Sequence, residues 1–253
     1  MATRTKTPQA YRHRAEAYQR SRPTWPPEVI HTLEREIGFS TASVVADIGS
    51  GPGTLTTLLL DHGNEVFAVE PGEDMRRVAA RLLGANPRFH SVAATAESTT
   101  LPDDCVDVVT AAQALTWFDP SQARDEFLRI LRPRGHLVGL WFRPVGESAY
   151  SLESGNLERR WAAEYGGNVQ PRFGRADVLD VLIPNRSEER YSCQSRSTWE
   201  QCVDAYVSTS YSPLPATPEG SRNIEHLRAI FSRHQEDGSV AFDYEVTLCW
   251  GRP

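Results

Sequence analysis

The chain contains 253 residues, of which 40% are hydrophobic and 24% are charged, proportions that are ordinary for a globular protein. Its formal net charge of -6 excludes the overall basic footprint that nucleic-acid-binding proteins carry. No segment approaches the ~20 apolar residues that a membrane-spanning helix needs. We therefore expect a cytoplasmic monomer or homodimer whose partner is a small molecule, with no nucleic acid and no membrane involved.

Residues 1–42 precede the predicted sheet. The segment Met1–Arg14 contains four basic residues and no acidic one, and we interpret it as a mobile leader in preference to a transit peptide, because termini are poorly ordered by default. Pro26-Pro27 then opens a helix that reaches Ile37 and ends at Gly38, as expected for proline at a helix start and glycine past its end. The four cysteines form no Cys-x-x-Cys pair, which favours a reducing compartment.

Residues 43–143 alternate short β-branched runs with helical segments, a pattern that predicts βαβ units and a parallel sheet. The predicted strands are Val44–Ile48, Glu65–Val69, Phe89–Ala93, Val106–Ala111 and His136–Phe142. The predicted helices between them are Thr54–Asp61, Glu73–Leu83 and Ser121–Leu131. Polar and apolar residues do not alternate strictly in these strands, as expected for strands covered on both faces.

Residues 144–185 contain several glycine and proline residues and one candidate helix, Leu157–Tyr165. We therefore interpret this segment as an inserted cap. Residues 186–253 add further predicted strands and helices: Glu189–Ser195, Trp199–Ser208, Ser221–Gln235 and Val240–Trp250. In Val240–Trp250 every second residue is apolar, which predicts an antiparallel strand with one buried face and one more solvent-exposed face. We predict one domain: a doubly wound, mostly parallel seven-stranded α/β sheet with an antiparallel C-terminal strand.

A glycine-rich turn follows the first predicted strand. The sequence Asp47-Ile48-Gly49-Ser50-Gly51-Pro52-Gly53 leads directly into a helix, which places the turn at the carboxyl end of a parallel strand, where ligands bind in open α/β sheets. Glycines there let the backbone approach a ligand closely. The second strand leads into Glu70, and an acidic side chain at that tip can accept hydrogen bonds from both hydroxyls of a ribose. Together these features predict a nucleoside site.

The same segments resemble the motifs of class I S-adenosylmethionine-dependent methyltransferases, which have a Rossmann-like fold. Val45–Gly53 is similar to the first motif of that family, and Glu70 is similar to the second. Further similar segments are Ala96-Glu97, Leu101–Val109, Gln113–Phe118 and Leu131–Leu137. The resemblance covers Ala15–Pro144 and extends more loosely to the end of the chain, where it is similar to a type 11-like subgroup that includes trans-aconitate methyltransferase-like proteins.

This resemblance implies S-adenosylmethionine as the methyl donor and no metal. The residues that it places at the donor are Tyr18, Arg22, Asp47, Gly49, Ser50, Gly51, Gly53, Glu70, Pro71, Met75, Ala96, Glu97, Gln113, Ala114 and Trp117. Many relatives carry histidine where this chain has Thr116, so no catalytic residue is assigned; Tyr18, Trp117 and Arg143 are candidates for positioning the reactants. The expected acceptor is a carboxylic acid or a hydroxyl compound, and Arg143, Arg172 and Arg175 are candidates for binding an acidic acceptor.

Two alternatives stay open at this stage. One is a non-catalytic module that binds the donor, since no general base can be assigned from the sequence. The other, less favoured, is a nicotinamide-dependent oxidoreductase, which also uses a glycine turn and an acidic residue after the second strand. The spacing Gly-x-Gly-x-x-Gly that is typical of such enzymes is absent from the turn at Gly49, Gly51 and Gly53.

Overall fold

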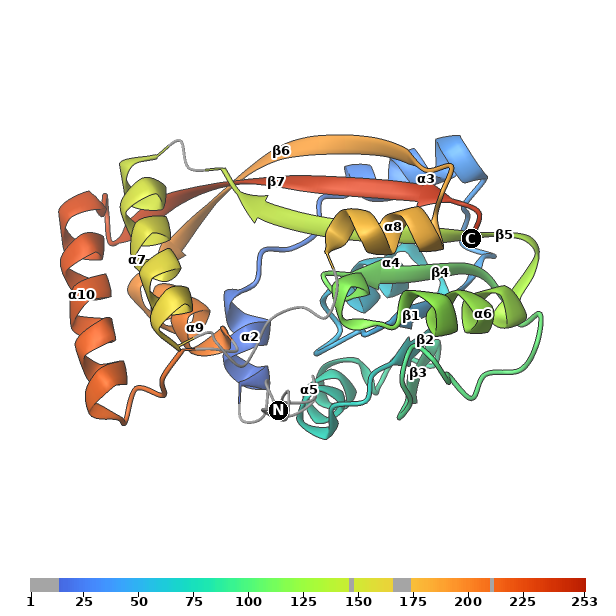
Figure 1. The fold of residues 1–253 in the computed structure, drawn as a ribbon, viewed down its shortest axis with the longest axis horizontal. Helices are drawn as coiled ribbons and strands as arrows, with labels where there is room; N and C mark the ends of the chain where they lie inside the picture. Colours follow the sequence, from blue (N-terminus) through green and yellow to red (C-terminus); the bar gives the residue numbers. More distant parts are fainter. Residues whose placement is uncertain (1–13, 146–147, 166–173, 210–211) are drawn as a thin grey trace. The chain divides into compact units, whose positions relative to one another are not determined.

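The computed structural model describes residues 14–145, 148–165, 174–209 and 212–253 (Figure 1). Its helices are α2 (Ala15–Ser21), α3 (Glu28–Ile37), α4 (Thr54–His62), α5 (Glu73–Leu83), η1 (Leu115–Trp117), α6 (Pro120–Ile130), α7 (Ala149–Tyr165), α8 (Arg175–Leu182), α9 (Trp199–Ser208) and α10 (Pro218–His234). Its strands are β1 (Val44–Ile48), β2 (Glu65–Val69), β3 (Phe89–Val92), β4 (Val106–Ala112), β5 (Leu131–Pro144), β6 (Ser187–Thr198) and β7 (Ser239–Gly251). Within the described ranges, no helix is both long enough and apolar enough to cross a membrane.

The strands form a seven-stranded sheet in the order β3-β2-β1-β4-β5-β7-β6. Strand β1 pairs in parallel with β2 and β4, β2 pairs in parallel with β3, and β4 with β5, whereas β7 is antiparallel. The predicted α/β fold with an antiparallel C-terminal strand is thus confirmed. Because the strand order changes direction beside β1, the carboxyl ends of β1 and β4 form the switch point at which such sheets bind ligands.

The described residues divide into two compact units. The core unit comprises those within 24–141, 171–191 and 246–253, and the helical unit comprises those within 1–23, 142–170 and 192–245. The core unit contains β1 to β4 with α3 to α6, and the helical unit contains α2, α7, α9 and α10. The residues of β5, β6 and β7 are shared between the units, and the predicted cap, residues 144–185, is also divided between them.

Several predicted boundaries are confirmed to the residue, namely those of β1, β2, α5 and α9. Helix α7 is longer than predicted, because it begins at Ala149 and not at Leu157. The added turns start after Ser148, whose hydroxyl accepts a hydrogen bond from the Ser151 amide at 3.1 Å and so caps the helix. Gly155 lies within these turns, and glycine is a weak helix former. The low helix propensity of this segment explains why its first turns, which begin after the Ser148 cap, were not predicted.

The prediction of a solvent-exposed face on β7 is wrong for the second half of the strand. All five residues from Val246 to Trp250 are buried, and Thr247, which was expected on the solvent-exposed face, is 3% exposed. Helix α8, which the sequence analysis did not predict, explains the difference. Its residue Leu182 and the following Ile183 belong to the same buried cluster as Cys249, so this part of β7 is covered on both faces. The alternation of exposed and half-buried residues occurs instead in the edge strand β6.

A half-buried ion pair between Glu126 and Arg129 of α6 makes the acid stability of the protein testable. Glu126 accepts hydrogen bonds from the Thr99 amide at 2.7 Å and from Arg129 Nη2 at 2.7 Å. The Arg129 guanidinium is the largest influence, and the pKa of Glu126 falls to about 2. Because this folded-state value lies below the ordinary value, the stabilisation is present above about pH 4.5 and is lost as the pH falls through 2.

We therefore expect Glu126→Gln to lower the free energy of unfolding by about 2 kcal/mol at pH 7, and the deficit to shrink as the pH falls from 4.5. Urea unfolding between pH 3 and 7 measures this. Asp125→Asn is the matched control, since Asp125 is exposed on the same helix. An equal deficit at every pH would show that the Glu126 charge does not contribute.

Candidate functional site

The turn after β1 is built from three glycines with left-handed backbone. The φ angles are 68° at Gly49, 57° at Gly51 and 91° at Gly53, in a region that side chains with a Cβ atom rarely adopt. A Cβ atom on Gly49 would lie 2.7 Å from the Ala114 Cβ atom. At Gly51, by contrast, a Cβ atom would have no neighbour within 4 Å. Gly49 therefore permits close packing inside the protein, and Gly51 borders open space that a ligand can enter.

Glu70, directly after β2, is held against this turn. Its Oε2 atom accepts a hydrogen bond from the Gly51 amide at 3.0 Å, and its Oε1 atom accepts one from the Gly72 amide at 2.7 Å. Burial raises the pKa of Glu70, and the two amide hydrogen bonds oppose that shift. Since a carboxylate oxygen can accept more than one hydrogen bond, both oxygens keep capacity for the hydroxyls of a ribose.

Asp47 lies beneath the turn and is 1% exposed. It accepts hydrogen bonds from the hydroxyls of Thr56 at 2.7 Å and Thr110 at 3.0 Å. Burial raises its pKa to about 6, although these hydrogen bonds lower it. The carboxylate thus links β1 to α4 and β4 and supports the turn. Neither threonine was a predicted site residue, and no sequence motif on its own indicated this connection.

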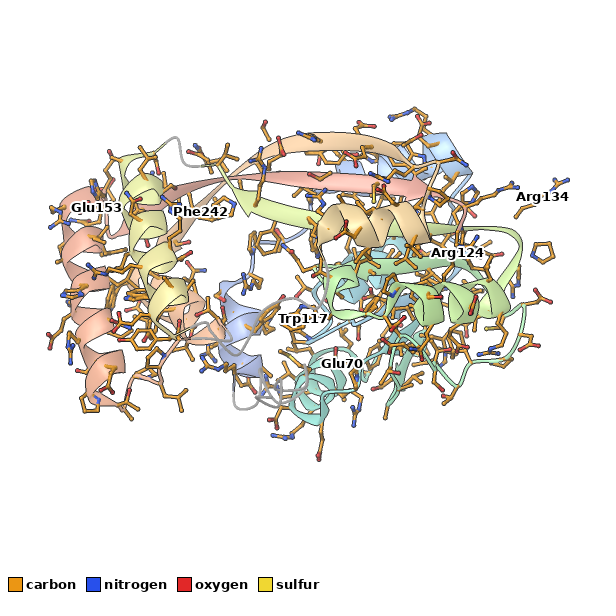
Figure 2. All side chains as sticks on the ribbon, viewed as in Figure 1. Glu70, Trp117, Arg124, Arg134, Glu153 and Phe242 are labelled. Atoms are coloured by element: carbon orange, nitrogen blue, oxygen red, sulfur yellow. The ribbon has the colours of Figure 1, made fainter. Side chains whose placement is uncertain are left out.

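The segment after β4 forms another part of the same edge. Gln113 has a φ of 59°, a strained value for a residue other than glycine, and its amide donates to the Leu140 carbonyl at 2.9 Å. Ala114 follows, and the short helix η1 then carries Trp117. Figure 2 shows the Trp117 and Glu70 side chains at one edge of the core unit. Strained backbone of this kind is common at binding sites.

The remaining predicted residues of the core unit follow β1, β2 and β3. Ser50 in the glycine turn donates its amide to the Val69 carbonyl at 3.2 Å. Pro71 is half-buried, whereas Met75 and Ala96 are buried. Glu97 accepts a hydrogen bond from the Asp119 amide at 2.9 Å. The ends of neighbouring parallel strands thus bring the predicted core-unit residues to one edge of the sheet, while their contact with a donor stays a prediction.

The other residues predicted from the sequence do not all belong to one unit. Tyr18 and Arg22 belong to the helical unit, where the Arg22 guanidinium carbon lies 4.4 Å from the centre of the Tyr18 ring. Arg143, also in that unit, is exposed and pairs with Glu245, with 3.2 Å between Nε and Oε1. Arg175 belongs to the core unit and lies over the Trp141 ring at 4.2 Å. Arg172 lies outside the described residues.

The glycine turn and Glu70 fit a nucleoside, because an oriented carboxylate lies beside open space at Gly51. A family profile described as a methyltransferase domain matches residues 46–139, which include both features. An uncharacterized methyltransferase of Mycobacterium tuberculosis (strain ATCC 25618 / H37Rv) is 42% identical over 236 residues, or 92% of this chain and 90% of the relative. The chain belongs to the class I S-adenosylmethionine-dependent methyltransferases. This membership decides against the nicotinamide-dependent oxidoreductase.

Two further relatives show how far the likeness of this methyltransferase extends. The trans-aconitate 2-methyltransferase of Azoarcus sp. (strain BH72) is 29% identical over 178 residues, which cover 68% of this chain and 67% of the relative. The structure of a proposed type II methyltransferase from Anaeromyxobacter dehalogenans has a TM-score of 0.65 at 22% identity, and the match covers 91% of this chain and 97% of that one. The second likeness is one of fold alone.

The donor of this methyltransferase, S-adenosylmethionine, supplies a methyl group on a positively charged sulfur when it is bound. Glu70 and the backbone at Gly51 are the groups that would hold its nucleoside. Because the methyl group is already activated, the protein's task is to hold and orient the reactants, and positioning alone can supply ~7–11 kcal/mol in favourable cases. In the helical unit, the guanidinium carbon of Arg22 lies 5.6 Å from the centre of the Phe142 ring. The sequence analysis placed Phe142 only at the end of a strand and did not name it as a site residue.

Proposed function

We propose that this methyltransferase transfers a methyl group to a small molecule that carries a carboxyl or hydroxyl group. The acidic balance of the chain, with a net charge of -6, supports a small acceptor over a nucleic acid. The observation that carries the carboxyl part of the proposal is the environment of Arg22. Its Nε atom is buried and has no hydrogen-bond partner among the described residues.

A buried donor without a partner costs about 1–3 kcal/mol, and more where the group is charged. An anionic ligand removes that cost, because a guanidinium binds a carboxylate through two parallel hydrogen bonds. Arg143 is a weaker candidate for this role, since it is exposed and already paired with Glu245. The donor contact that the family resemblance implies for Arg22 is an alternative use of the same group.

The test is a screen of the purified protein with methyl-labelled S-adenosylmethionine. Small carboxylic acids, alcohols, phenols and amines are compared with transfer RNA and DNA, and labelled products are identified by mass spectrometry. We expect label in a small carboxylic acid or hydroxyl compound and none in nucleic acid. Label in nucleic acid alone would contradict the proposal. Donor binding without transfer to any acceptor would favour the non-catalytic module.

A further inference from the structure

We propose that Arg76 is a positioning residue of the donor site: its guanidinium fixes Glu70 at the end of β2, and its positive charge keeps the Glu70 carboxylate ionised for the ribose hydroxyls. The residues concerned lie in α5, after β2 and in the glycine turn, which all belong to the core unit. The inference rests on the assignment of the donor to Glu70 and is independent of the acceptor proposed above.

The carbonyl of Glu70 lies where the hydrogen bonds between β2 and β3 end. The last paired residues of these strands are Val69 and Val92, and the Glu70 amide still donates to the Val92 carbonyl at 3.0 Å. The Ala94 amide, which would be the next donor to β2, instead donates to the Val92 carbonyl at 3.2 Å. Arg76 takes its place, because its Nη1 atom lies 2.8 Å from the Glu70 carbonyl oxygen. A side chain of α5 thus continues the hydrogen bonding of β2 past the last residue of β3.

Three hydrogen bonds join Glu70, which is labelled in Figure 2, and the first turn of α5 into a closed ring. The Gly72 amide donates to Glu70 Oε1 at 2.7 Å, the Arg76 amide donates to the Gly72 carbonyl at 3.0 Å, and the Arg76 guanidinium donates to the Glu70 carbonyl. A Cβ atom on Gly72 would lie 2.8 Å from Glu70 Oε1, so glycine permits the close approach. Arg76 therefore fixes the main chain of the residue whose carboxylate is held beside Gly51.

The same contact brings a positive charge close to the Glu70 carboxylate. The carbonyl and the carboxylate belong to one residue, so a guanidinium bound to the first lies near the second and favours its ionised form. Burial has the largest influence and raises the pKa of this carboxyl, and the Asp47 carboxylate of β1 raises it as well. The amides of Gly72 and Gly51 and the charge of Arg76 lower it. Arg76 thus opposes both the burial of Glu70 and the repulsion from Asp47.

Calorimetric titrations with S-adenosylhomocysteine between pH 5 and 8 test both effects. Arg76→Met loses the hydrogen bond and the charge, so we expect about tenfold weaker binding at pH 8 and a deficit that widens as the pH falls. The deficit widens because the pKa of Glu70 rises further without the positive charge, and the ionised form is lost at a higher pH. Arg76→Gln, which is neutral, should widen in the same way. Arg76→Lys keeps the charge and should retain the pH dependence of the wild type.

The matched control is Arg77→Met, which removes the same charge from the next residue of α5, where the side chain is exposed and pairs with Asp74. We expect this control to bind as the wild type does at every pH. The second control adds Arg76→Met to Glu70→Gln, and its deficit relative to Glu70→Gln should not change with pH, because no carboxyl is left at this position to titrate. Thermal unfolding shows that each variant is folded.

Two results would overturn the inference. The first is an Arg76→Met variant that binds S-adenosylhomocysteine as Arg77→Met does, or with a deficit that is equal at every pH, since Arg76 would then act on the fold alone. The second is a deficit that still widens at low pH in the Glu70→Gln background, which would assign the charge effect to another group. A wrong donor site is recognised separately, by unchanged affinity in Glu70→Ala. The proposed function fails independently, when no small acceptor is methylated.

Discussion

Replacing Glu70 with alanine is expected to lower the affinity for S-adenosylmethionine and S-adenosylhomocysteine by about 100-fold or more. The carboxylate is the group that would accept hydrogen bonds from the ribose hydroxyls, and hydrogen bonds to a charged group contribute roughly 1.5–3 kcal/mol each. The change also leaves the amides of Gly51 and Gly72 without their acceptor, so the turn loses its connection to the end of β2. Calorimetric titration of both ligands measures the loss directly.

The matched control is Glu73→Ala, three residues further along, where the side chain is exposed in the first turn of α5. A second variant, Glu70→Gln, keeps the size of the side chain and should recover only part of the affinity, since its amide nitrogen cannot accept a hydrogen bond. Unchanged affinity in Glu70→Ala would contradict the placement of the donor at this carboxylate. Thermal unfolding separates a binding defect from a loss of the fold.

The same carboxyl makes donor binding sensitive to pH. Burial raises the pKa of Glu70 above its ordinary value, so the ionised form that accepts two hydroxyl hydrogen bonds is lost at a higher pH than for an exposed glutamate. We expect donor affinity to decrease as the pH is lowered through this raised pKa, and Glu70→Gln to abolish that decrease. Titrations between pH 5 and 8 test this. A variant that keeps the full pH dependence would assign it to another group.

The sequence was most informative where local pattern and tertiary environment agree. Strands β1 and β2 are short apolar runs that end at glycine or at an acidic residue, and both lie where they were predicted. The turn from Gly49 to Gly53 was predictable because its left-handed backbone requires glycine. Glu70 followed from its place after β2. These features depend on a few neighbouring residues, so they can be predicted without knowledge of distant contacts.

Long-range contacts account for what the sequence did not predict. The role of Asp47 depends on Thr110, 63 positions away, and a threonine on a buried strand has no distinguishing pattern. Helix α8 is only 8 residues long and becomes stable by burying Val178, Leu179 and Leu182 in the core. The relation between Arg22 and Phe142 likewise joins segments far apart in the chain. Local periodicity contains no signal for such pairs.

The glycines of the turn should separate packing from ligand binding when each is changed to alanine. Gly49→Ala combines a left-handed φ with a Cβ atom 2.7 Å from that of Ala114, so we expect a loss of about 2–4 kcal/mol in the free energy of unfolding. Gly51→Ala has the same kind of φ, but its Cβ atom would enter open space. Its expected cost is about 1–2 kcal/mol in stability, together with a donor affinity about tenfold or more weaker.

Gly38→Ala is the control for backbone strain alone, because Gly38 has a φ of 68°, no atom near its Cβ position, and lies at the end of α3. Chemical unfolding and titration with S-adenosylhomocysteine are compared across the three variants. If Gly51→Ala binds the ligand as tightly as Gly38→Ala does, the donor does not approach the backbone at Gly51. If Gly51→Ala is as stable as Gly38→Ala yet binds weakly, the space beside Gly51 is the part of the turn that the donor occupies, and Gly49 serves the packing of Ala114.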